Sequence, residues 1–147
     1  MSIIAIDILT KEFYDTISFR DGVSPDSTTL YDIFHGDGLL INNSSETALL
    51  YTALSYVQNL ESLVAVGETK QYISLEIASK TEIFGKAAQR ASIYEYTFAD
   101  YEPEVMSRGI NFIQYVQIGE NWYITSMVWH DENEDHQIPA AYLRSRV

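Results

Sequence analysis

The chain contains no cysteine, which excludes disulfide bonds, thiolate metal sites and thiol nucleophiles. Basic residues are also scarce: nine Lys and Arg stand against 21 Asp and Glu, which gives a net charge of −12. Such an excess of negative charge repels nucleic acid and anionic membranes, so neither is an expected partner. The charge favours solubility, and a cationic partner is the alternative that it leaves open.

Long apolar runs are missing as well. No stretch approaches the roughly 20 apolar residues that a membrane-spanning helix needs. The first residues, MSIIAIDILTKEF, lack the basic start of a signal peptide and are interrupted early by acids. These absences predict a soluble, cytoplasmic protein.

What the chain does have is the length of one ordinary domain and an abundance of aromatic rings. Its 147 residues predict a single domain over residues 1–147, and a hydrophobic content of 46% is enough for a core. Eleven Tyr, six Phe and two Trp are more rings than a minimal core needs. Because aromatic side chains often line pockets and interfaces, we expect at least one of these features.

Hydrophobic periodicity divides the chain into a helical part and a strand part. The predicted helices cover residues 8–20, a short segment that starts at Ser24-Pro25, and a segment from Ser44 or Ser45 to Gly67. A short apolar strand over residues 39–41 precedes the third helix. From Ile73 the period changes to two, which predicts strands over residues 73–78, 87–98, 108–118 and 122–129.

Helices followed by strands are typical of the α+β class. The sheet has to bury one face, and the helices are the cover that the sequence offers. We therefore predict a cone-shaped, curved antiparallel sheet that packs on three N-terminal helices and encloses a pocket. In the last hairpin both faces are mostly apolar, which predicts a second cover on the outer face. A partner subunit would supply it, so we expect a homodimer.

The register of the last hairpin follows from a turn centred on Gly119-Glu120. The predicted pairs on one face are Gln114 with Thr125, Phe112 with Met127, and Ile110 with Trp129. A buried amide has to be hydrogen-bonded, which gives Gln114 two interpretations. It is either a polar anchor for a ligand in an apolar pocket, or a core amide satisfied by a neighbour such as Thr125.

The second half of the chain contains several short residue combinations that are informative together: Phe84-Gly85, Ser92 with Tyr94-Glu95, Arg108-Gly109-Ile110-Asn111 with Gln114, Trp122 with Ile124, Trp129, Ile138-Pro139 and Tyr142-Leu143. With the order of the elements, they resemble the nuclear transport factor 2-like superfamily, which includes ketosteroid isomerase-like and polyketide cyclase-like domains. The resemblance covers nearly the whole chain and is strongest to a bacterial branch of unassigned function. It implies the cone fold, a pocket and frequent homodimers. It specifies no reaction, because the superfamily spans isomerases, dehydratases, cyclases, hydrolases and binding modules.

Six side chains are candidates for the pocket: Tyr14, His35, Tyr94, Glu95, Gln114 and Trp129. The resemblance implies that Tyr14 lies where an active-site tyrosine could stand, but no local motif places the aspartate base and the oxyanion donors of a ketosteroid isomerase. An enclosed Glu95 could act as a general acid or base. The alternative is an ion pair with Arg90 or Arg108. Asp15 is a further candidate for an acid or base.

No motif for a metal or a cofactor is present. His130 and His136 bracket a run of acids whose spacing matches no specific metal site, so a solvated acidic loop is expected there. Phosphate-binding and serine-nucleophile motifs are also missing. Two hypotheses follow. The domain binds a small apolar or amphipathic ligand, or it is a cofactor-independent isomerase, dehydratase or cyclase that uses general acid/base chemistry in the same pocket. A purely structural role is a third possibility, which a cavity too small for any ligand would favour.

Overall fold

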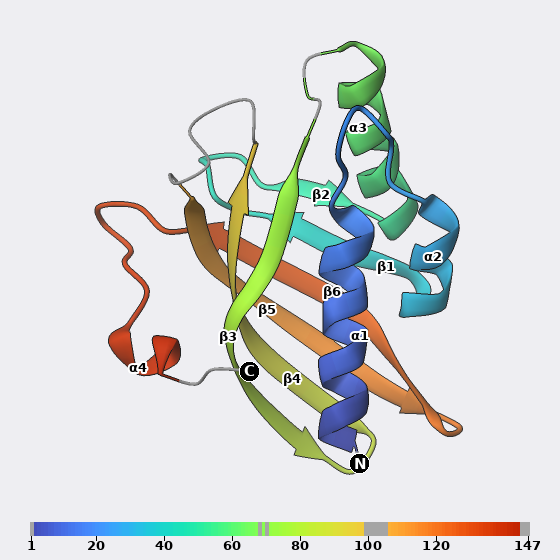
Figure 1. The fold of residues 1–147 in the computed structure, drawn as a ribbon. Coiled ribbons are helices and arrows are strands. Elements are labelled where there is room, and N and C mark those ends of the chain that lie inside the picture. The colour runs from blue at the N-terminus through green and yellow to red at the C-terminus, as the bar shows by residue number, and fades with distance from the viewer. Residues whose placement is uncertain (1, 68, 70, 99–105, 145–147) are drawn as a thin grey trace.

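The computed structural model describes residues 2–67, 69, 71–98 and 106–144, and it confirms the α+β class. The elements in chain order are α1 (Ser2–Ile17), α2 (Ser27–Ile33), β1 (Phe34–Asn42), β2 (Leu49–Tyr51), α3 (Ala53–Ala65), β3 (Ile73–Phe84), β4 (Ala87–Thr97), β5 (Ser107–Ile118), β6 (Asn121–Asp131) and α4 (Ala140–Leu143). Figure 1 shows α1 to α3 gathered on one side of a curved, open sheet and α4 on the other side. Among the described residues, no helix has both the length and the apolar character that a membrane crossing requires.

The six strands form one sheet in the order β2-β1-β6-β5-β4-β3. The strands β3 to β6 are an antiparallel meander, as expected. The sheet as a whole is mixed, because β1 pairs with β6 in parallel. A tight turn forces neighbouring strands to be antiparallel, but β1 reaches β6 from far away in the sequence and no turn sets its direction.

Helix α1 packs its predicted apolar stripe, Leu9, Phe13 and Ile17, into the core on the concave face of the sheet. The helix begins at Ser2 and ends at Ile17, earlier than the predicted range at both ends. It ends early because Phe19 leaves the helix and exchanges two backbone hydrogen bonds with Tyr72, of 2.9 and 3.0 Å. This bridge ties the end of the helix to the start of the sheet.

The third helix begins later than predicted. Residues 49–51 do not join it but form β2, which pairs with the end of β1. Thr52 then caps α3 in place of Ser44 or Ser45: its hydroxyl accepts from the Ser55 amide, and the Ser55 hydroxyl accepts from the Thr52 amide. The predicted stop at Gly67 is confirmed, since α3 ends at Ala65 and Gly67 adopts a φ of 76°.

The second helix is also capped by a different residue than predicted. Asp26 accepts a 3.0 Å hydrogen bond from the Thr28 amide, so α2 begins at Ser27 instead of following Ser24. A carboxylate is as good an N-cap as a serine hydroxyl, and here it lies directly before the first helical residue.

The register of the last hairpin follows the prediction only near its turn. Tyr115 pairs with Ile124 as expected, and Thr125 is then an extra residue in a β-bulge. Beyond it, the partners are Gln114 with Ser126, Phe112 with Val128, and Ile110 with His130, so the three predicted pairs are wrong. The bulge turns Met127 and Trp129 toward the helices, opposite Ile113 and Asn111.

Candidate functional site

A cavity of about 180 Å³ lies between α3 and the concave face of the sheet. Eight of its lining residues are aromatic: Phe19, Tyr51, Tyr56, Tyr72, Tyr94, Tyr96, Phe98 and Trp129. The others are Asn42, Asn59, Leu60, Leu63, Thr69 and Asp131. Asp131 is therefore the one carboxylate among the described residues that line this aromatic cavity.

Two tyrosines from β4 hold Asp131. The Tyr94 hydroxyl donates to Oδ1 and the Tyr96 hydroxyl donates to Oδ2, each at 2.5 Å. Such distances are typical of strong, charge-assisted O–H···O⁻ hydrogen bonds. Burial, followed by the hydrogen bond to Asp131 and its charge, raises the pKa of Tyr94 and that of Tyr96 far above the ordinary value. Both hydroxyls thus keep their protons, and the carboxylate is fixed in place by one donor on each oxygen.

Gly109 makes the contact between Tyr94 and Asp131 possible. On neighbouring strands, Tyr94 pairs with Gly109 and Gly109 pairs with Asp131, so the three residues form one row across the sheet. The Tyr94 ring passes over the glycine to reach the carboxylate. A Cβ at position 109 would collide with the Tyr94 hydroxyl and would lie 2.5 Å from the His130 carbonyl oxygen. The space above Gly109 is therefore part of the site.

The aromatic rings pack on one another around the cavity. Tyr56 makes edge-to-face contacts with Trp129, at 5.8 Å between ring centroids, and with Tyr51, at 5.3 Å. Tyr72 lies 5.8 Å from Tyr96. Burial raises the pKa of Tyr72 to about 12 and that of Tyr56 well above its usual value. The walls therefore offer neutral ring faces and neutral hydroxyl groups.

Of the six predicted pocket residues, the structure places Tyr94 and Trp129 together in this cavity. His35 is exposed at the start of β1, with its ring 6.0 Å from that of Tyr123. Glu95 and Gln114 lie on the outer face of the sheet. Gln114 is exposed there, because the neighbouring residues of β5 are the ones that point to the helices, so it is not a core amide. It borders a separate pocket of about 190 Å³ that Phe112 and Tyr142 also line.

The expected cations do not pair with Glu95. Arg108 lies opposite Glu95 in the sheet, but its guanidinium contacts Glu132 at 3.1 Å. Arg90 is on the concave side, where it contacts Asp7 at 2.5 Å. Arg90 and Glu95 lie on opposite faces of β4, because side chains alternate between the two faces along a strand. This alternation explains why Arg90 cannot pair with Glu95.

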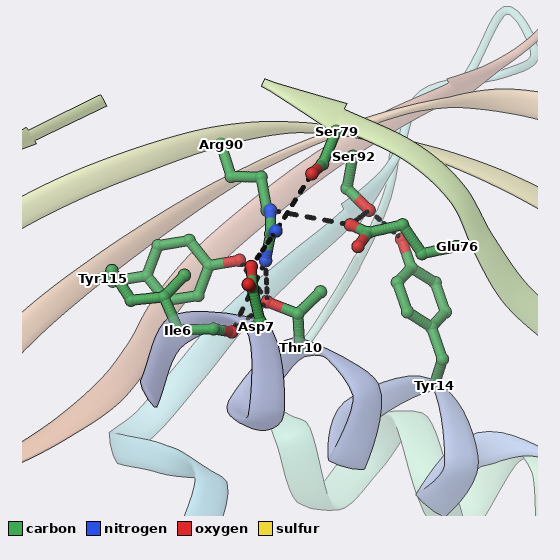
Figure 2. Close-up of polar contacts among 9 residues, drawn as sticks. All are labelled: Ile6, Asp7, Thr10, Tyr14, Glu76, Ser79, Arg90, Ser92 and Tyr115. Atoms are coloured by element: carbon green, nitrogen blue, oxygen red, sulfur yellow. Dashed lines mark hydrogen bonds and ion pairs between the residues drawn. The ribbon is translucent and has the colours of Figure 1, made fainter. Parts of the chain in front are cut away.

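Tyr14 belongs to a second polar cluster, between α1 and the sheet (Figure 2). Its hydroxyl lies 2.8 Å from that of Ser92, which donates to Glu76 at 2.5 Å. Glu76 lies 3.7 Å from Nε of Arg90. Burial raises the pKa of Glu76, and the Arg90 charge partly offsets that rise. Tyr14 and Glu76 also border an open cleft of about 330 Å³ beside α1.

The Arg90 guanidinium is the centre of this cluster, and Arg90 is 2% exposed. It donates to Thr10 at 3.0 Å and to Ser79 at 2.9 Å, in addition to its contacts with the two carboxylates. These partners come from α1 and β3, and Arg90 itself belongs to β4, so the cluster fastens the helix to the sheet. Asp15 takes no part, since it is exposed and pairs with Lys11 at 2.7 Å.

The acidic segment between His130 and His136, which begins in the last residues of β6, is only partly a solvated loop. Its first carboxylate, Asp131, is the cavity residue described above, whereas Glu134 and Asp135 are exposed. The rings of His130 and His136 lie 5.2 Å apart. In the described part of the chain, no three His, Asp or Glu side chains are grouped so that they could hold a metal ion.

Sequence reasoning missed Asp131, Tyr96, Tyr72 and Tyr56. One signal was present for Tyr96: Tyr94, Tyr96 and Phe98 occupy every second position and therefore share one face of a strand. Asp131 follows Trp129 by the same interval, but it also opens an acidic run that is typical of a loop. Its place in the cavity depends on β6 continuing to Asp131 and on the bulge at Thr125.

Comparison with known proteins supports the fold. No protein-family profile matches the chain, and no curated protein matches its sequence. A solved structure of an NTF2-like protein of unknown function from Silicibacter pomeroyi DSS-3 has a TM-score of 0.62 and 18% identity, over 89% of this chain and 96% of that one. A protein of unknown function with a cystatin-like fold from Nostoc punctiforme PCC 73102 has a TM-score of 0.67 and 11% identity, over 90% and 92% of the two chains.

A third solved structure, an uncharacterised protein with a cystatin-like fold from Caulobacter vibrioides, has a TM-score of 0.64 and 12% identity, over 90% of this chain and 91% of that one. At such identities the likeness is one of fold. The resemblance drawn from the sequence is confirmed at this level: the chain has the NTF2-like, or cystatin-like, fold.

Proposed function

We propose that this domain binds a small apolar or amphipathic ligand in the cavity between α3 and the sheet. The observation that carries the proposal is Asp131, fixed by two tyrosine hydroxyls in a cavity with eight aromatic lining residues. A preorganised polar group among ring faces is typical of small-molecule sites. A volume of about 180 Å³ favours a compact ligand.

Tryptophan fluorescence tests this proposal, because the chain has two tryptophans and one of them lines the cavity. In a W122F variant, Trp129 is the sole reporter, and we expect one-ring amphipathic compounds to shift its emission in a saturable way. In the matched W129F variant, Trp122 remains, away from the cavity, and its emission should stay unchanged. Equal responses from the two variants, or no response from either, would contradict a ligand site at Trp129.

Catalysis in the same cavity is the second candidate function. General acid/base chemistry needs a carboxylate beside a tyrosine donor at one point of a pocket, and Asp131 with Tyr94 and Tyr96 has that arrangement. The reaction would be a cofactor-independent isomerisation, dehydration or cyclisation, with Asp131 as the base and a tyrosine as the proton donor.

Replacing Tyr94 with phenylalanine separates the two functions. The Y94F change removes one donor from Asp131 and keeps the ring. An enzyme should lose turnover by about a hundredfold or more, since a positioned proton donor contributes on that scale. A binding module should change its affinity by only about tenfold or less, the value of one hydrogen bond. Steady-state kinetics and titration calorimetry on the same variant decide between the two.

We also propose that the outer face of the sheet pairs with a second copy of the chain. Phe112 and Val128 are cross-strand neighbours on that face and are 51% and 39% exposed. An apolar pair left in water favours association. We expect sedimentation velocity to show a dimer that F112K weakens by at least about tenfold, through burial of a charge. The control V23K, at a 67% exposed loop position, should leave it intact. A monomeric parent chain would contradict the proposal.

A further inference from the structure

The Asp131 carboxylate meets no cationic side chain among the described residues that line the cavity: none of them is Lys, Arg or His, and Asp131 is the one acid among them. The nearby Arg108 is engaged with Glu132. A carboxylate oxygen can accept two hydrogen bonds, and each oxygen of Asp131 receives one from a tyrosine. Asp131 therefore has acceptor capacity left for a ligand that donates.

The walls around Asp131 suit a cation in a second way. The faces of Trp and Tyr rings attract ammonium groups, and several aromatic side chains around one carboxylate form a cage for such a group. Trp129, Tyr56 and Tyr72 supply the rings here, packed edge to face or tilted against their neighbours. Because burial keeps the tyrosines protonated, these rings are neutral and do not compete with Asp131 for the charge of the ligand.

The other ligand classes fit less well. A carboxylate or phosphate ligand would meet Asp131 at close range, inside a chain of net charge −12. A purely apolar ligand would displace water from Asp131 and offer it no hydrogen bond in return, which is costly for a charged group. The volume of about 180 Å³ favours a ligand with one ring or a short chain.

We propose that the cavity takes a small organic amine, with its ammonium group seated against Asp131 and its apolar part against the rings of Trp129 and Tyr56. The inference rests on the proposed binding function and specifies its ligand class. It assigns Asp131 as the residue that selects charge and the aromatic wall as the part that selects size.

Three probes of similar shape test the inference: benzylamine, benzyl alcohol and benzoate, titrated calorimetrically into the full chain at neutral pH. We expect benzylamine to bind at least about tenfold more tightly than benzyl alcohol, because a charge-assisted hydrogen bond replaces a neutral one. Benzoate should bind more weakly than either. Equal affinity for the amine and the alcohol would overturn the amine inference and leave the ligand-binding proposal standing. No binding of any probe to folded protein would overturn both.

Variants locate the effect at Asp131. The D131N change should reduce the ratio of the benzylamine affinity to the benzyl alcohol affinity to about twofold or less. The control D32N removes the same charge from an exposed position of α2 and should keep the full preference. If D131N does not fold, W129L serves instead: it removes a ring face and should lower the affinity for tetramethylammonium by about fivefold or more. The assignment would be overturned if D131N left the benzylamine preference unchanged and W129L left the affinity for tetramethylammonium unchanged.

Discussion

Replacing Arg90 with methionine is expected to lower the free energy of unfolding by about 3–5 kcal/mol at neutral pH, because a buried carboxylate then loses its counter-charge. The side chain of Arg90 is 1% exposed and that of Glu76 is 10% exposed, so solvent cannot replace the ion pair. The side chain of Asp7 is 37% exposed, so water screens its ion pair with Arg90 and that pair contributes less to the stability. Methionine fills a volume comparable to that of arginine, so the decrease in the free energy of unfolding comes mainly from the lost charge and less from changed packing. Urea unfolding of R90M and the parent chain measures it.

Glu76 makes the loss in R90M depend on pH. Burial raises the pKa of Glu76, and Arg90 now offsets part of that rise, so its removal raises the pKa further. An acid whose pKa is higher in the folded state stabilises the fold when it is protonated. This contribution is complete below the unfolded pKa and is lost as the pH rises through the folded pKa. R90M should therefore regain part of its lost stability as the pH falls from neutral toward about 5.

Two further variants serve as controls for R90M. The ion pair of Arg108 with Glu132 is partly exposed, at 35% and 22% of the side chains, so R108M should cost about 1 kcal/mol or less. Adding E76Q to R90M removes the orphaned charge and should restore part of the stability at neutral pH, with the pH dependence reduced. Equal costs for R90M and R108M would show that the cluster around Arg90 does not hold α1 to the sheet.

The sequence predicted the fold well because the fold depends on local patterns. The apolar stripe of Leu9, Phe13 and Ile17, the change of period at Ile73 and the stop at Gly67 are each visible in a short window. The early end of α1 has a non-local cause, because Phe19 pairs with Tyr72, which nearby residues cannot identify. The late start of α3 has a closer cause that the helical period concealed: residues 49–51 pair with the end of β1.

The sequence predicted Tyr94 and Trp129 as pocket residues but not Asp131, for a geometric reason. The alternation along a strand shows that Tyr94 and Glu95 face opposite ways, but it does not show which face the helices cover. One extra residue at Thr125 then reverses the facing of everything beyond it in β6, including Asp131. The Arg90 cluster joins the β3–β4 hairpin to α1, which is about 80 residues away in the sequence, so no spacing could have indicated the contact with the helix.

Substituting alanine for Gly109 is the second change for which we expect a large effect. The new methyl group would occupy the space through which Tyr94 reaches Asp131, and it would also press on the backbone carbonyl of His130, which cannot swing away. Overpacking of this kind costs about 1–3 kcal/mol, and the lost Tyr94–Asp131 hydrogen bond adds about 1.5–3 kcal/mol because its acceptor is charged. Thermal and urea unfolding of G109A measure the sum, and titration with an amine probe should show weakened binding.

A double-mutant cycle with Tyr94 tests whether the cost of G109A arises at this contact. Leucine at position 94 has no ring to cross Gly109, so G109A should cost at least about 1 kcal/mol less in the Y94L background than in the parent chain. The variant S126T adds a methyl group to the outer side of the sheet and should change stability by about 0.5 kcal/mol or less. Additive costs for G109A and Y94L would mean that the two residues act independently. A smaller cost of G109A in the Y94L background would instead identify the bare backbone at Gly109 as the feature that lets the Tyr94 side chain of β4 reach the Asp131 carboxylate of β6.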